Sequence, residues 1–117
     1  MNQYLLLLHE TPADFQDVSP AQMQEIVARY SAWAAEMGQR GLLVSGEKLT
    51  DDGGRHLRLA GGAPMASDGP YAEAKDVIGG IFIIKAAGDA DAEKQAASCP
   101  HLRRRNWIEV RRIDAMT

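Results

Sequence analysis

Two short segments of the chain are apolar at every position. Leu5 to Leu8 is an unbroken run of leucines, and Ile81 to Ile84 has the sequence Ile, Phe, Ile, Ile. A strand with one face in water alternates apolar and polar residues, so both segments are predicted to be strands that are covered on both faces. The leucine run is far shorter than the roughly 20 residues that cross a bilayer.

Length and composition favour one ordinary globular domain, residues 1–117. The chain has 117 residues, of which 45% are hydrophobic and 25% charged. Its net charge of -3 provides no positive field for nucleic acid or an anionic membrane, so we expect neither partner. Cys99 is the only cysteine, and no signal-peptide pattern opens the sequence. We therefore expect a cytoplasmic protein.

The first predicted helix has clear start and stop signals. Ser19 and Gln22 form a capping-box pattern around Pro20, and Gly38 and Gly41 mark the end. One apolar stripe with helical spacing lies between them. It consists of Met23, Ile26, Val27, Tyr30, Trp33, Ala34 and Met37.

A second helix is predicted, with Asp89 or Asp91 as its N-cap and Pro100 as its stop, although it offers mainly alanines to a core. The remaining strands are predicted at Tyr4–Leu8, Leu42–Leu49, His56–Leu59, Pro64–Ser67, Ile78–Ala86 and Trp107–Ile113. Gly46 in the second of these indicates a bulge or a close approach.

The order of these elements is strand, helix, strand, hairpin, strand, helix, strand. This order predicts an α+β fold, the ferredoxin-like βαββαβ arrangement with a hairpin insertion. Two helices can cover only one face of the sheet. A second copy of the chain, packed sheet against sheet, is the simplest way to cover the other apolar face. We therefore expect a homodimer.

Several sequence motifs carry a family resemblance. Asp68 to Lys75 has the sequence DGPYAEAK and is followed by IGGIF at Ile78 to Phe82, while SGEKL occupies Ser45 to Leu49. With the opening YLLLLHE and the SCP before the last strand, the chain resembles the YCII-related family, in its DGPF-domain branch, over nearly its whole length. The resemblance implies a dimeric α/β barrel built from two ferredoxin-like units, with no assigned reaction.

The wider family has been linked to a histidine and aspartate pair as a proposed active site. The matching positions of this chain hold Gln22 and Cys99. Glutamine does not titrate and cannot replace an acid/base histidine. The resemblance therefore implies that this pair is absent here.

Two interpretations of Asp68 stay open. A short acidic side chain before Gly-Pro can accept backbone N–H groups and fix a turn. It can also receive a proton or a polar ligand in a cleft. We take Asp68 and His9 as the candidate catalytic residues. The candidate ligand-binding residues are Glu47, Gly69, Pro70, Tyr71, Glu73 and Lys75.

The histidines do not predict a metal centre. His9 lies just beyond the first predicted strand, where it can act as an acid/base group or simply bond to backbone or water. His9, His56 and His101 are scattered along the chain and Cys99 has no cysteine partner, so we predict no metal and no cofactor. Cys99 is predicted to be a buried, unreactive thiol, and His101–Arg105 a solvated loop.

Two functions from different classes fit these observations. The first is a homodimer that binds or transforms an unknown small molecule by cofactor-free acid/base chemistry in a cleft near the DGPY motif. The alternative is a non-catalytic protein-interaction or regulatory module. A perturbed carboxylate in a closed pocket favours the first function, whereas an open, solvated Asp68 favours the second.

Overall fold

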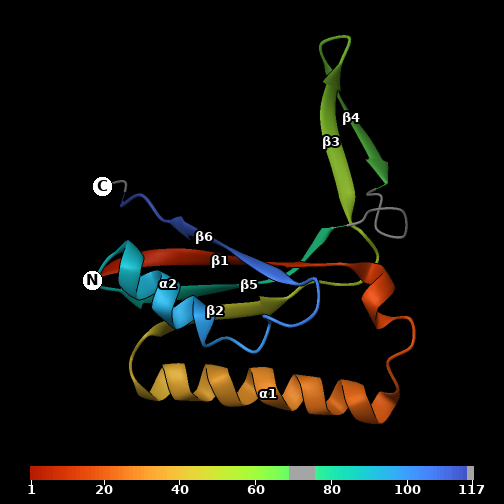
Figure 1. The fold of residues 1–117 in the computed structure, drawn as a ribbon. Helices are drawn as coiled ribbons and strands as arrows, with labels where there is room; N and C mark the ends of the chain where they lie inside the picture. Colours follow the sequence, from red (N-terminus) through yellow and green to blue (C-terminus); the bar gives the residue numbers. More distant parts are fainter. Residues whose placement is uncertain (69–75, 116–117) are drawn as a thin grey trace.

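The computed structural model describes residues 1–68 and 76–115. Strands β2, β5, β1 and β6, in that order, form an antiparallel sheet, and β3 and β4 form a separate hairpin. This is the strand order of the predicted ferredoxin-like arrangement, with the hairpin as an insertion. The elements are β1 (Asn2–Glu10), a 3₁₀ helix (Pro12–Phe15), α1 (Pro20–Gln39), β2 (Leu43–Lys48), β3 (Arg55–Ala60), β4 (Ala63–Asp68), β5 (Val77–Ala86), α2 (Asp89–Ala97) and β6 (Trp107–Arg112) (Figure 1).

Both helices lie on one side of the sheet (Figure 1), and the hydrophobic core fills the space between the helices and the sheet. Trp33 of α1 contacts Phe82 of β5 edge to face, with ring centroids 5.0 Å apart. A Cβ atom on Gly46 would lie 2.7 Å from the Phe82 ring, which confirms the predicted close approach. The strand residues of the core are Tyr4, Leu6, Leu8, Phe82, Ile84 and Ala86.

The predicted start of α1 is confirmed. Ser19 Oγ accepts the Gln22 backbone N–H at 3.1 Å, and the Gln22 side chain accepts the Ser19 N–H at 2.9 Å. The apolar stripe is only half buried, however. Trp33 is buried, whereas Val27 is 54% exposed. A cavity of about 200 Å³ lies beside the first half of α1, between that half and the 3₁₀ helix, and Ile26 is the residue of the stripe that lines it.

The start of α2 uses the two predicted aspartates in different ways. Gly88 is the N-cap residue. The Asp91 carboxylate accepts the Ala87 backbone N–H at 2.9 Å, and Asp89 accepts the Tyr4 hydroxyl at 2.7 Å. Asp91 therefore supports the helix start, while Asp89 joins the helix to β1. No helix of residues 1–68 and 76–115 is both long and apolar enough to cross a bilayer.

The side of the sheet opposite the helices is here called the open face. Its middle is apolar, because Leu5 and Leu7 of β1 lie beside Ile83 and Ile81 of β5. These four side chains are partly exposed, whereas their neighbours on the helix side are buried. The prediction that both segments are strands is confirmed, and the two helices cover one of their two apolar faces. The open face consists of Gln3, Leu5, Leu7, His9, Ser45, Glu47, Ile81, Ile83, Lys85, Trp107, Glu109 and Arg111.

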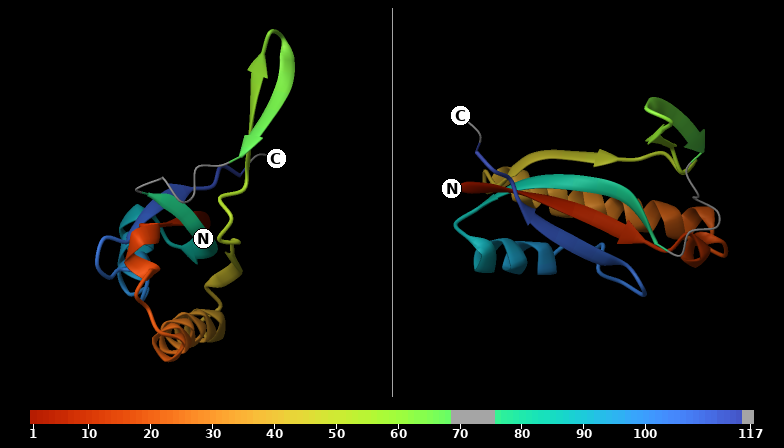
Figure 2. Two further views of the ribbon diagram at one scale, coloured as in Figure 1. Left: turned by 90° about the vertical axis from the view of Figure 1, so that its right-hand side faces the viewer. Right: turned by 90° about the horizontal axis from the view of Figure 1, so that it is seen from above.

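The β3–β4 hairpin, here called the arm, projects from the open-face side of the sheet (Figures 1 and 2). Gly61 and Gly62 form its tip with positive φ angles, as the favoured two-residue hairpin turn requires. Every residue of both strands is exposed. The radius of gyration is 16.2 Å, compared with about 13 Å for a compact chain of this length. The predicted hairpin is confirmed, and it stands away from the domain body.

Candidate functional site

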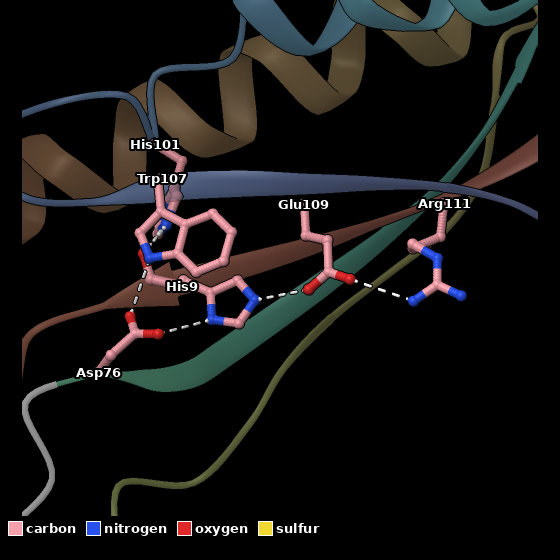
Figure 3. A network of polar contacts seen from close by, with 6 residues as sticks. All are labelled: His9, Asp76, His101, Trp107, Glu109 and Arg111. Carbon is pink, nitrogen blue, oxygen red and sulfur yellow. Dashed lines mark hydrogen bonds and ion pairs between the residues drawn. The ribbon is translucent and has the colours of Figure 1, made fainter.

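A polar cluster surrounds His9 on the open face. Nδ1 of His9 lies 3.1 Å from Asp76 Oδ2, and Nε2 lies 3.1 Å from Glu109 Oε1 (Figure 3). A neutral imidazole can donate from one nitrogen only, so both contacts are hydrogen bonds only when the ring carries two protons. The geometry therefore suits an imidazolium held between two carboxylates.

Trp107 fixes the plane of the His9 ring. The two residues are partners in the β1–β6 ladder, and their rings stack with centroids 3.8 Å apart and 9° between the planes. The indole N–H donates to Asp76 Oδ1 at 3.0 Å. A cation over an indole face is attracted by the ring electrons, so stacking and charge favour the same ring position. Asp76 thus joins the edges of both rings (Figure 3).

Glu109 is the second carboxylate of the cluster. Its other oxygen, Oε2, accepts a hydrogen bond from Arg111 at 3.2 Å. The hydrogen bond from His9 and then that from Arg111 lower the pKa of the Glu109 carboxyl. Glu109 therefore remains an acceptor for the histidine over a wider pH range than an isolated glutamate would.

A second histidine, His101, forms a hydrogen bond with the backbone of His9. Nε2 of His101 lies 2.7 Å from the His9 carbonyl oxygen, which can only accept, so Nε2 carries the proton. Nδ1 then accepts the Tyr30 hydroxyl at 2.6 Å, and Arg103 donates to the same hydroxyl oxygen at 3.0 Å. The prediction that His101 lies in a solvated loop is wrong. His101 is 1% exposed, both of its ring nitrogens have protein partners, and burial lowers its pKa.

His9 and Asp76 line a cleft of about 530 Å³. This volume lies within the range of small-molecule sites. Gly53 and Gly54, which have positive φ angles, turn the chain there as predicted. The cleft lies where the arm leaves the sheet, so its wall belongs partly to the arm. The other lining residues are Leu49, Thr50, Asp52, Gly53, Gly54, His56, Val77 and Ile78.

Glu10 follows His9 on β1 and points to the opposite side of the strand. It is 8% exposed, and burial raises the pKa of its carboxyl. Its carboxyl group fills the space beside Gly79, where any Cβ would overlap it. Sequence analysis missed this residue. The signal for it was Gly79 and Gly80 within a buried strand, since glycine there indicates a close approach.

The other predicted site residues do not line this cleft in the described part of the chain. Asp68 ends β4 and forms an ion pair with Arg55 of β3, with most of its side chain in solvent. Glu47 is exposed on the open face. The predicted ligand-binding residues 69–71, Glu73 and Lys75 lie outside the described residues.

The structure brings His9 together with three residues that sequence analysis had not selected, namely Asp76, Trp107 and Glu109. The alternation of β6 contained a usable signal, because Trp107 and Glu109 occupy the same face of that strand. Their partners across the sheet are His9 and Leu7. That pairing depends on the residue register between β1 and β6, which the predicted strand order alone does not supply.

The residues at the family's proposed histidine and aspartate positions have structural roles. Gln22 belongs to the capping box of α1. Cys99 is buried, as predicted, and burial raises the pKa of its thiol. Among residues 1–68 and 76–115, no three histidine, cysteine, aspartate or glutamate side chains converge in a way that could hold a metal ion.

The antiparallel sheet, the two helices on one side and the histidine cluster on the other define a ferredoxin-like α+β domain with a candidate site on its open face. The chain matches the model of the YCII-related domain over residues 2–117. It therefore belongs to the YCII-related family. No curated protein matches the chain.

Proposed function

We propose that the protein is a homodimer of the DGPF branch that binds a small molecule in the cleft beside His9 and exchanges protons with it without a cofactor. The observation that carries this proposal is the pairing of each His9 ring nitrogen with a carboxylate, at 3.1 Å on both sides, at the wall of a cleft. Such a cluster contains a proton donor and proton acceptors within hydrogen-bond reach of each other.

The lining of the cleft favours a particular class of ligand. Asp52 and Asp76 contribute two carboxylates, which outnumber the single imidazolium of His9, while Val77 and Ile78 contribute apolar surface. Carboxylates repel an anion and accept hydrogen bonds from neutral or cationic groups. We therefore expect a neutral or cationic molecule with hydrogen-bond donors and an apolar part.

The proposed dimer is supported by the open face. Leu5, Leu7, Ile81 and Ile83 form a contiguous apolar area between two polar edges. Contiguous apolar patches of this kind mark interaction sites on soluble proteins. A second copy, with its sheet packed about 10 Å away, would cover this area and give the dimeric α/β barrel.

A fragment screen by two-dimensional NMR tests the proposed function. Neutral and cationic fragments should shift the backbone signals of Leu49, Val77 and Ile78. The best fragment should bind His9→Gln at least about tenfold more weakly, a loss of about 1.4 kcal/mol. Glu93→Gln, an exposed carboxyl variant on α2 and away from the open face, is the control and should bind as wild type does. Fragment shifts confined to other surfaces would contradict the proposal.

One observation favours the alternative function, a non-catalytic interaction or regulatory module. Asp68 is exposed and paired with Arg55 on the arm, as expected for a residue with a structural role. If this alternative is correct, Asp68→Asn and His9→Gln should both leave fragment binding unchanged. Isothermal titration of the best fragment against both variants distinguishes the two functions.

A further inference from the structure

One side of the arm is apolar from its tip as far as the Arg55–Asp68 ion pair at its base, and it is exposed. Leu57 pairs with Ala66, and Leu59 pairs with Pro64. Paired residues of an antiparallel ladder share a face, so these side chains form one apolar strip. Leu57 is 69% exposed and Leu59 is 76% exposed. The opposite side of the arm contains the pair of Arg58 with Met65 and is more polar.

A two-stranded hairpin of this kind is at best marginally stable alone in water. The arm shares no strand with the four-stranded sheet. Its apolar strip therefore needs a partner surface, both to remove Leu57 and Leu59 from water and to hold the hairpin in one conformation.

The direction and length of the arm favour a second copy of this chain as its partner. It rises on the side of the sheet where a second copy is proposed to pack (Figures 1 and 2). Its strands have 6 residues each, which gives a length of about 20 Å at about 3.3 Å per residue. Packed sheets lie about 10 Å apart. The arm is therefore long enough to pass the sheet of a second copy.

The size of the interface supports the same partner. A standard protein interface uses roughly 20 to 30 residues from each partner. The open face alone has fewer than this, and its central leucines and isoleucines are already partly buried. The apolar strip of the arm supplies additional area on the same side of the molecule.

We infer that the arm clasps a second copy of this chain, with Leu57 and Leu59 packed against the partner. This inference rests on the homodimer of the proposed function and adds to it the part of the chain that secures the pair. Asp52, Gly53 and His56 lie at the base of the arm and line the cleft beside His9. Docking of the arm on the partner therefore also fixes this wall of the cleft.

Sedimentation equilibrium of three proteins tests the clasp. The double variant Leu57→Asp/Leu59→Asp places charges on the apolar strip, while Met65→Asp places one on the opposite side of the same hairpin. The dimer dissociation constant should rise at least about tenfold in the double variant and stay within about twofold of wild type in Met65→Asp.

A wild-type dimer whose dissociation constant is unchanged by the double variant, or is equally changed by Met65→Asp, would overturn the clasp and leave the proposed homodimer intact. A wild-type monomer at micromolar concentration would instead overturn the homodimer together with the clasp.

A measurement on the wild-type protein avoids any effect of the variants on arm folding. In dimers mixed from isotope-labelled and unlabelled chains, filtered NOE spectra should show contacts from the Leu57 and Leu59 methyl groups to the other chain. Their absence in a sample that sediments as a dimer would also overturn the clasp.

Discussion

The three histidines have three different roles, and their ring contacts distinguish them. His9 lies between two carboxylates on the open face. His101 is buried, with a backbone carbonyl and a tyrosine hydroxyl as its partners. His56 is exposed on the arm. His9 was predicted as a candidate catalytic residue because of its place at the end of an apolar strand, and it lies at the centre of a polar cluster.

His101 predicts a pH dependence of stability. Burial lowers its pKa, so the folded protein binds fewer protons at this site than the unfolded chain does. The free energy of unfolding should therefore fall as the pH drops from about 6.5 towards the lowered pKa of the folded state. His101→Gln should flatten this part of the stability curve. Urea unfolding between pH 7.5 and 5 measures the slopes, and parallel curves for wild type and His101→Gln would contradict the role assigned to His101.

The close approach of Gly79 on β5 to the Glu10 side chain on β1 predicts a steric effect of any larger residue at position 79. In Gly79→Ala the new methyl group would overlap the Glu10 carboxyl group, which ends a flexible side chain and can turn aside, so the cost should lie at the low end of the overpacking range, about 1 kcal/mol. The matched control is Gly38→Ala, which meets no atom within 4 Å and should stabilise α1 by about 0.5–1 kcal/mol. Thermal and chemical unfolding measure both. The cost of Gly79→Ala should shrink in a Glu10→Ala background, and an unchanged cost there would show that Glu10 is not the obstacle.

At the scale of elements, local signals were the most reliable guide. The capping box at Ser19 depends on neighbours in sequence, so α1 starts where predicted. The extent of core cover depends on tertiary packing, and Val27 of the apolar stripe remains exposed for that reason. The 3₁₀ helix Pro12–Phe15 was missed because so short a turn has no periodicity. Of the residues in the polar cluster, only His9 was predicted from the sequence, because Asp76 and Glu109 are brought beside it by the strand pairing.

The alternation of β5 identifies which substitution should separate the proposed dimer. Ile83 lies on the open face, whereas Ile84 is fully buried beneath the helices. Ile83→Asp should give a folded monomer, because the charge would be desolvated in the dimer only, at a cost of several kcal/mol. Val44→Asp, an exposed edge-strand change, should leave the dimer intact. Light scattering should report twice the chain mass of 12.8 kDa for wild type and Val44→Asp, with circular dichroism to check folding. A wild-type dimer that survives Ile83→Asp would show that the interface lies elsewhere.

At the scale of the whole molecule, the extended shape follows from the arm, and it predicts a difference in protease sensitivity. Arg58 is exposed at the middle of β3. In a clasped dimer it should be cut by trypsin more slowly than in the Ile83→Asp monomer, because cleavage requires the local strand to open. Cleavage at Arg29, exposed on α1, serves as the reference. Mass spectrometry of timed digests measures both sites, and equal Arg58 cleavage in dimer and monomer would be evidence against a docked arm.

The hydrogen-bonded ladder of the arm is separate from that of the main sheet. The arm can therefore change in length and side chains without any change in the register of β2, β5, β1 and β6. If the arm clasps a second copy as proposed, two related chains with identical sheets but different arms would pair more tightly with their own kind than with each other. The inserted hairpin would then be a place where self-recognition diverges after gene duplication, while the domain that carries the His9 cluster stays the same.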